Sequence, residues 1–172
     1  MLDDLTPTIS IVVSTSAAYS PGDCVGGLLT NTILVKPRSI NSSTAERLEI
    51  CLNYVTIIDA DANKKELNLL IFNNQPSGTY LNHGQFQLAS ADASKLITNI
   101  NFPATEFLTV GAYSTVTQIF NNLPLYTTEI EDSRTNSDIN IPLYFLLACQ
   151  TSPRWTGSSN LTIRIGYNIL HI

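Results

Sequence analysis

The chain has 172 residues and a net charge of −5 at pH 7, and only 13 % of its residues are charged whereas 44 % are hydrophobic. This length suits one domain with a full core. No basic cluster is denser than Lys64-Lys65, which argues against a phosphate-binding surface and therefore against direct nucleic-acid binding. Asp3 and Asp4 precede a short apolar run at Ile9–Val13, so we expect cytoplasmic synthesis and no membrane-spanning segment.

The first part of the chain predicts a flexible N-terminal arm at Met1–Pro7, followed by one domain over residues 8–172. Thr8–Val13 is typical of a first strand. Pro21-Gly22-Asp23 predicts a tight turn, because proline presets φ at the first corner and glycine accepts a positive φ at the second. Gly26-Gly27 lies inside a strand-like run, which indicates a β-bulge or the close approach of another backbone.

The segment Glu46–Asn74 is predicted to form a central hairpin. Apolar and polar residues alternate from Leu48 to Val55, which is the pattern of a strand with one buried face. Leu67–Phe72 is almost continuously apolar, which suits a central strand covered on both faces. We expect the two strands to be joined by the acidic turn after Asp59, and the second to end at the Asn73–Gly78 cluster.

The second half of the chain continues the β pattern with one short helix. Residues 90–97 are the best helix candidate, about two turns long, with Ser90 or Asp92 as N-cap. Leu143–Cys149 is continuously apolar and should be a central strand, whereas Leu161–Ile169 alternates strictly. The remaining expectations are polar loops at residues 36–45 and 129–137 and short strands at residues 80–88, 100–103, 107–110 and 114–120.

The predicted fold is therefore all-β. About eight strands with turn signals at near-regular spacing and almost no helix indicate a two-sheet antiparallel sandwich, most simply a jelly roll.

The sequence provides no convincing catalytic, cofactor or metal site. Asp59, Asp61 and Asn63 imitate the start of a calcium loop, but Lys64 stands where such loops need glycine. His83 and His171 are the only histidines, and neither belongs to a hydrolase motif. Cys24, Cys51 and Cys149 are widely spaced in apolar runs, so we expect buried free thiols. We accordingly predict no enzymatic activity and no cofactor.

Three residues are candidate contacts with a partner. Trp155 and Arg154 are of the types enriched at the centres of interfaces, and they lie together in the loop Pro153–Gly157. Tyr19 lies in an early loop and has the same two interpretations as Trp155. Each aromatic ring either contacts a partner or folds back to cap the end of the sandwich.

The polar surface leaves a second choice open. Ser, Thr and Asn make up about 30 % of the chain. Neutral side chains of this kind suit surfaces that other subunits cover, because charged groups there would lose their hydration. They are equally typical of an ordinary β protein, whose strands favour Thr and whose turns favour Asn and Ser.

The order of these features resembles the auxiliary capsid proteins of tailed bacteriophages, also called cement or decoration proteins. The resemblance is carried by Ala18–Gly27, by Leu69–Phe72 followed by Asn and Pro, by Ser90-Ala91-Asp92 with Lys95-Leu96-Ile97, by Ile100–Pro103, and by Leu161–Tyr167 after a proline-containing loop. Cys24 departs from it, where a small apolar residue is expected.

The resemblance implies a jelly-roll-like sandwich on the outer surface of a virion, where it bridges and stabilises subunits of the major capsid protein, often as a dimer or trimer. It brings no catalytic residue. The alternative is a carbohydrate-binding module, lectin-like or receptor-binding, in which Trp155 and tyrosine rings stack on sugars.

Overall fold

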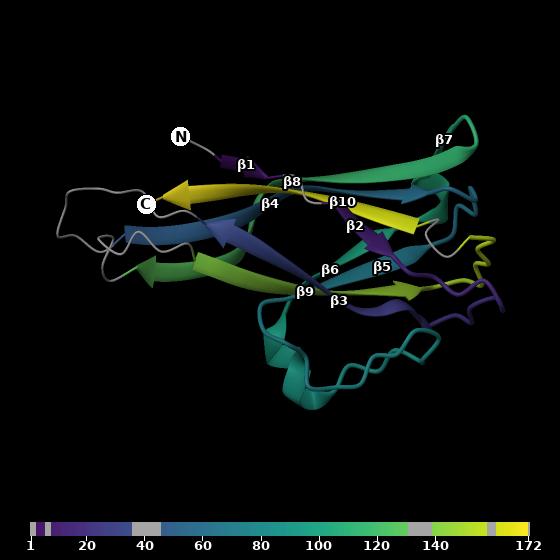
Figure 1. Ribbon diagram of the computed structural model, residues 1–172, viewed down its shortest axis with the longest axis horizontal. Helices are drawn as coiled ribbons and strands as arrows, with labels where there is room; N and C mark the ends of the chain where they lie inside the picture. The colour runs from purple at the N-terminus through teal and green to yellow at the C-terminus, as the bar shows by residue number, and fades with distance from the viewer. Residues whose placement is uncertain (1–2, 6–7, 36–45, 131–138, 158–160, 172) are drawn as a thin grey trace.

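The computed structural model describes residues 3–5, 8–35, 46–130, 139–157 and 161–171 as two antiparallel sheets packed face to face (Figure 1). The six-stranded sheet has the order β1-β10-β4-β8-β7, with β2 also pairing with β10, and the four-stranded sheet has the order β3-β9-β5-β6. The strands are β1 (Asp3–Leu5), β2 (Thr8–Ile11), β3 (Cys24–Val35), β4 (Glu46–Asp59), β5 (Leu67–Phe72), β6 (Leu96–Phe102), β7 (Leu108–Val110), β8 (Tyr113–Ile130), β9 (Ile139–Cys149) and β10 (Leu161–His171).

This arrangement confirms the all-β sandwich and has the strand order of a jelly roll. Leaving out the short β1 and β7, the sheets read β2-β10-β4-β8 and β3-β9-β5-β6, so the chain crosses from one sheet to the other at most connections. The prediction that β4 and β5 form a hairpin is therefore wrong. β4 pairs with β8 and β10, whereas β5 pairs with β6 and β9. The turn after Asp59 carries the chain from the six-stranded sheet to the four-stranded sheet.

The hydrophobic core lies between the sheets, and its residues come from both. β10 buries alternate side chains toward it, as its sequence pattern predicted. In β4 the predicted alternation holds from Leu48 to Leu52 and then changes phase at a register shift, so that Val55 enters the core and Tyr54, predicted on the apolar face, does not. β5 buries both of its faces: Leu67, Leu69 and Ile71 point into the main core, while Leu70 and Phe72 join a second cluster on the outer face of the four-stranded sheet. The second cluster is covered by residues 73–95, which we call the strap, and its partly buried members include Phe86 and Leu88.

Three local predictions need correction. Asp3–Leu5, placed in a flexible arm, form β1 and pair with Tyr167–Ile169 of β10. Residues 90–97 begin as the 3-10 helix η1 (Ser90–Lys95), with Ala89 as N-cap and no side-chain cap, and continue directly as β6. Residues 80–88 form no strand apart from one bridge between Asp23 and Gln85, although Phe86 and Leu88 do pack inward. A second 3-10 turn, η2, spans Ala104–Glu106. The loop predicted at 36–45 lies outside the described residues. The loop predicted at 129–137 begins too early, because Glu129 and Ile130 belong to β8, and its remaining residues lie outside the described ones.

The two glycine predictions are confirmed. Gly22 has φ +88° in a turn closed by the hydrogen bond from Asp23 N to Ser20 O (3.0 Å). Gly26 and Gly27 have φ +80° and +76°, and the pairing of β3 with β9 shifts register between Val25 and Leu28. This bulge also permits the predicted close approach, because a Cβ on Gly27 would lie 3.1 Å from the backbone oxygen of Tyr80.

The strap is held in its folded shape by the buried carboxylate of Asp92, whose hydrogen-bond partners all belong to the strap itself. Its oxygens accept hydrogen bonds from Ser77 N (2.7 Å), Gly78 N (2.9 Å), Ser77 Oγ (2.8 Å) and Tyr80 Oη (3.1 Å), and from Lys95 Nζ (2.9 Å). The backbone bond from Ser77 is the largest of several influences that hold the pKa of Asp92 well below its usual value. The prediction of Asp92 as a helix N-cap missed this role. Two of its partners, Ser77 and Gly78, lie fourteen or more residues earlier in the chain, where a local capping pattern gives no information.

A lowered pKa of Asp92 makes the strap sensitive to acid. The stabilisation is fully present above the pKa of an unfolded aspartate, about 4, and is lost as the pH falls from there toward the lower pKa of the folded state. We therefore expect Asp92→Asn to be less stable than the unmodified protein at pH 7, and this difference to shrink as the pH falls below about 4. Urea unfolding at a series of pH values measures it. A difference that is constant with pH contradicts the assignment.

Candidate interaction surface

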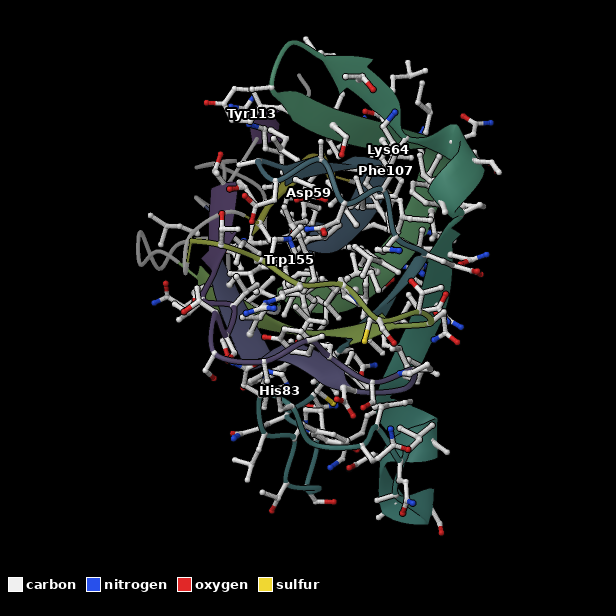
Figure 2. All side chains as sticks on the ribbon, turned by 90° about the vertical axis from the view of Figure 1, so that its right-hand side faces the viewer. Asp59, Lys64, His83, Phe107, Tyr113 and Trp155 are labelled. Carbon is white, nitrogen blue, oxygen red and sulfur yellow. The ribbon has the colours of Figure 1, made fainter. Side chains whose placement is uncertain are left out.

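Trp155 lies at one end of the sandwich, in the loop between β9 and β10 (Figure 2). Its side chain is 1 % exposed, and its indole Nε1 donates to Asp59 Oδ1 (3.1 Å) at the end of β4. The Asp59 carboxylate also accepts from the backbone of Asp61 (3.1 Å) and Asn63 (2.6 Å). Burial nevertheless raises the pKa of Asp59, since the loss of hydration outweighs these bonds. The ring thus closes the end of the core.

The carboxylates of the turn that resembles the start of a calcium loop are engaged in contacts of this kind. Asp59 holds the turn and Trp155, and Asp61 accepts from Thr156 Oγ1 (2.7 Å), so both carboxylates serve to dock the Trp155 loop. Among the residues the structure describes, no three His, Cys, Asp or Glu side chains are grouped as a metal site would require.

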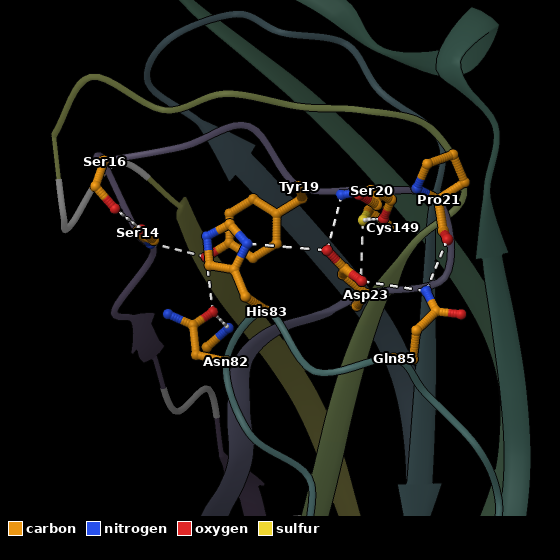
Figure 3. Close-up of polar contacts among 11 residues, drawn as sticks. Ser14, Ser16, Tyr19, Ser20, Pro21, Asp23, Asn82, His83, Gln85 and Cys149 are labelled. Carbon is orange, nitrogen blue, oxygen red and sulfur yellow. Dashed lines mark hydrogen bonds and ion pairs between the residues drawn. The ribbon is translucent and has the colours of Figure 1, made fainter.

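Tyr19 and Trp155 pack edge to face, with ring centroids 5.2 Å apart. The Tyr19 ring also stacks on the imidazole of His83, with ring centroids 3.8 Å apart. Figure 3 shows the polar contacts around these rings. Tyr19 Oη accepts from Ser14 N (2.8 Å) and donates to Asn82 Oδ1 (2.7 Å), and His83 Nδ1 lies 3.8 Å from Asp23 Oδ2. The cluster ties the loop after β2, the strap and the Trp155 loop together.

The cysteine beside this cluster is not an activated nucleophile. Cys149 is buried, and its thiol donates to the backbone oxygen of Ser20 (3.0 Å). Burial raises the pKa of Cys149 to about 11, whereas a reactive cysteine needs a lowered pKa. Cys24 and Cys51 are also buried and free, as predicted. Cys24 belongs to the second cluster, beneath the strap, whereas Cys149 belongs to the main core. The two thiols thus lie on opposite sides of the four-stranded sheet.

The structure separates the three predicted partner contacts. Trp155 and Tyr19 are each 1 % exposed, so the interpretation as rings that cap the sandwich is the one the structure supports, and neither ring is available to a partner in this conformation. Their types were a misleading signal because a large ring closes the end of a core as readily as it fills a partner's pocket. Arg154 is exposed beside them.

Exposed apolar side chains gather elsewhere, on the outer face of the six-stranded sheet. Leu108 (70 % exposed), Val110 (59 %) and Tyr113 (53 %) lie in the ribbon formed by β7 and the start of β8, and Ile119 (83 %) lies further along β8. Because side chains opposite each other in an antiparallel pair share a face, the register places Leu108 beside Thr115 and Ile58, and Ile119 beside Tyr54. We call these residues the outer patch: Tyr54, Thr56, Ile58, Leu108, Val110, Tyr113, Thr115, Thr117 and Ile119.

The outer patch carries no charge. In the sequence, no charged residue occurs from Phe107 to Thr128. Arg164 of β10, which is exposed, stands opposite Thr56 and so borders the outer patch. The sequence showed the low overall charge and a short strand at residues 114–120, but it did not indicate an exposed apolar surface there. Ile119 belongs to the alternating run 114–120, and the pattern does not reveal which of its two faces is buried.

A scan against protein-family models and a search of curated proteins found no match for this chain. None of the described helices is long and apolar enough to cross a membrane.

Proposed function

We propose that this chain is a structural protein of a virion. It attaches to the outer surface of the capsid, bridges neighbouring subunits of the major capsid protein and stabilises the shell, without catalysis. The single observation that supports this function best is the outer patch. An uncharged sheet face with four strongly exposed apolar side chains is the type of surface that other proteins cover.

The architecture suits the same role. The two sheets share one continuous core, and the loops at one end are fixed by Asp59 and Trp155. Such a scaffold presents a rigid face and loses little conformational freedom on binding. Repetition on a lattice adds avidity, so each contact with the capsid need only be weak.

The carbohydrate-binding alternative gains nothing from the geometry. Its main argument was Trp155, whose ring is buried and hydrogen-bonded to Asp59. The strongly exposed tyrosine of the outer patch, Tyr113, stands opposite Val110, and the patch has no charged or amide side chain to hold a sugar's hydroxyl groups.

The test is an add-back experiment with capsids that lack this protein. We expect such capsids to break at a lower temperature, and purified protein to restore their stability. Ile119→Lys places a charge at the most exposed apolar position of the outer patch and should weaken capsid binding by about tenfold or more, because burying an unpaired charge is costly. Co-sedimentation and thermal release of the packaged genome measure the two effects.

Arg154→Ala is the matched control, since Arg154 is exposed but lies outside the outer patch. It should bind as the unmodified protein does. Ile119 is 83 % exposed, so its replacement should leave the fold intact. If capsids lacking the protein are as stable as complete ones, the proposed function is wrong. If the protein stabilises them but Ile119→Lys binds normally, the outer patch is not the contact surface.

A further inference from the structure

The outer edge of β3 has an unpaired stretch. β3 is the last strand of the four-stranded sheet and pairs with β9 on one side only. Its first residues are covered by the strap: Cys24 N donates to Gly84 O (2.8 Å), His83 N donates to Cys24 O (3.0 Å), and Gly26 N donates to Asn82 Oδ1 (2.9 Å). From Leu28 to Leu34, no strand among the described residues pairs with this edge.

This edge lacks the usual protection against pairing with another strand. Proteins commonly guard an edge with charged side chains, proline or a very short strand. β3 has twelve residues, and no charged residue or proline occurs between Cys24 and Val35. Its bulge at Gly26-Gly27 lies in the part that the strap already covers. The regular part beyond the bulge therefore offers unpaired backbone groups to a further strand.

The sequence of the unpaired stretch indicates which strand fits it. Leu28-Leu29-Thr30-Asn31-Thr32-Ile33-Leu34 reads the same in chemical type from either end, with Asn31 at its centre. Two copies that pair antiparallel about Asn31 place Thr30 opposite Thr32 and every aliphatic residue opposite an aliphatic one. Cross-strand pairs of Thr with Thr and of aliphatic side chains are favourable in antiparallel sheets.

The two faces of the stretch agree with this pairing. Thr30, Thr32 and Leu34 are exposed on the outer face of the sheet, while Leu29 packs against the main core and Ile33 belongs to it. Asn31 lies on the inner face between Leu29 and Ile33, because it stands opposite the core residue Leu143. Pairing two copies would align the outer faces that carry the threonines, and would bring the two Asn31 side chains together on the inner face between aliphatic pairs. The net charge of −5 makes two copies repel each other in general, so an uncharged edge is where they approach at least cost.

We propose that a second copy of this chain pairs antiparallel with Leu28–Leu34, joining the two four-stranded sheets into one continuous sheet across a two-fold axis at Asn31. The contact is isologous, because both copies use the same stretch and residue 30 of each copy meets residue 32 of the other, and it closes as a dimer. It uses β3 and leaves the outer patch on β7 and β8 free. The dimer therefore does not depend on the proposed attachment to a capsid.

Sedimentation velocity of the purified protein over a range of concentrations tests the proposal, and we expect a dimer. The double variant Thr30→Lys, Thr32→Lys places lysine opposite lysine at both cross-strand positions, which should raise the dimer dissociation constant by about tenfold or more. Both threonines are exposed, so the fold should be retained, as circular dichroism would verify.

The matched variant Thr30→Lys, Thr32→Glu tests the register. In the proposed pairing each lysine lies opposite a glutamate of the other copy, so this variant should remain a dimer. Protein with Thr30→Cys should also form a disulfide when mixed with protein carrying Thr32→Cys, but neither should do so alone, because residue 30 faces residue 32 of the other copy and neither faces its own counterpart. A monomer, a trimer, or a dimer that survives the two lysines would overturn the proposal.

Discussion

Replacing Trp155 by alanine is expected to lower the free energy of unfolding by about 3–5 kcal/mol, as for other fully buried tryptophans. The indole fills the end of the core between Tyr19 and the Asp59 turn, and its removal leaves a cavity that these rigid neighbours cannot fill. Asp59 would also lose one of the hydrogen bonds that compensate for its burial. Urea unfolding followed by circular dichroism measures the loss, since the variant has no tryptophan left to report it.

Two further variants separate packing from binding. Trp155→Phe keeps an aromatic ring but lacks the Nε1–H donor, so it should lose less than alanine does, including about 1–3 kcal/mol for the Asp59 oxygen left without its partner. Arg154→Ala should change stability by less than about 0.5 kcal/mol, because the side chain is exposed. If Trp155→Ala were as mild as Arg154→Ala, the ring would not be a core residue.

The fold class could be predicted because alternation is a local signal. The apolar face of β10 is a run of every second residue from Leu161 to Ile169, and all five of these side chains are buried. The continuous apolar run of β5 likewise predicted burial on both faces, and the strap supplies the second cover. Both patterns record what the strand itself contacts, and they need no knowledge of which strand lies beside it.

Strand partners could not be predicted in the same way. β4 and β5 follow each other in sequence and were assigned to one hairpin, yet they belong to different sheets. Pairing depends on which edges meet when the whole sandwich closes, and the turn Asp59–Lys65 is long enough to cross the core as well as to fold back. Asp59 carries the decisive information, since its buried carboxylate organises the crossover through Asp61 and Asn63.

The candidate surface was missed for a related reason. A large aromatic residue in a loop, such as Trp155, has the composition of an interface anchor, but burial is decided by distant parts of the chain. Tyr19, Trp155 and Asp59 come from three separate segments that meet only in the folded protein. Conversely, Ile119 looked like an ordinary strand residue. Its 83 % exposure follows from the alternation of β8, because Ser114 and Val116 are buried and Ile119 lies on the opposite face.

The bulge in β3 gives the second large effect, and Gly26→Ala is expected to destabilise the protein by about 2–5 kcal/mol. The left-handed backbone conformation at φ +80° costs a residue with a Cβ about 1–2 kcal/mol. In addition, a Cβ at this position would lie 2.3 Å from Cγ2 of Ile11, which is completely buried and must move. Overpacking of this kind adds about 1–3 kcal/mol.

Gly111→Ala is the control that separates these two contributions. Gly111 also has a positive φ, +63°, in the exposed turn between β7 and β8, but a Cβ there would meet nothing within 4 Å. It should therefore cost only the backbone strain, about 1–2 kcal/mol. Urea unfolding followed by the fluorescence of Trp155, the single tryptophan, measures both variants. If the two variants lost equal stability, the close contact of Ile11 with Gly26 would contribute nothing to the cost of the substitution.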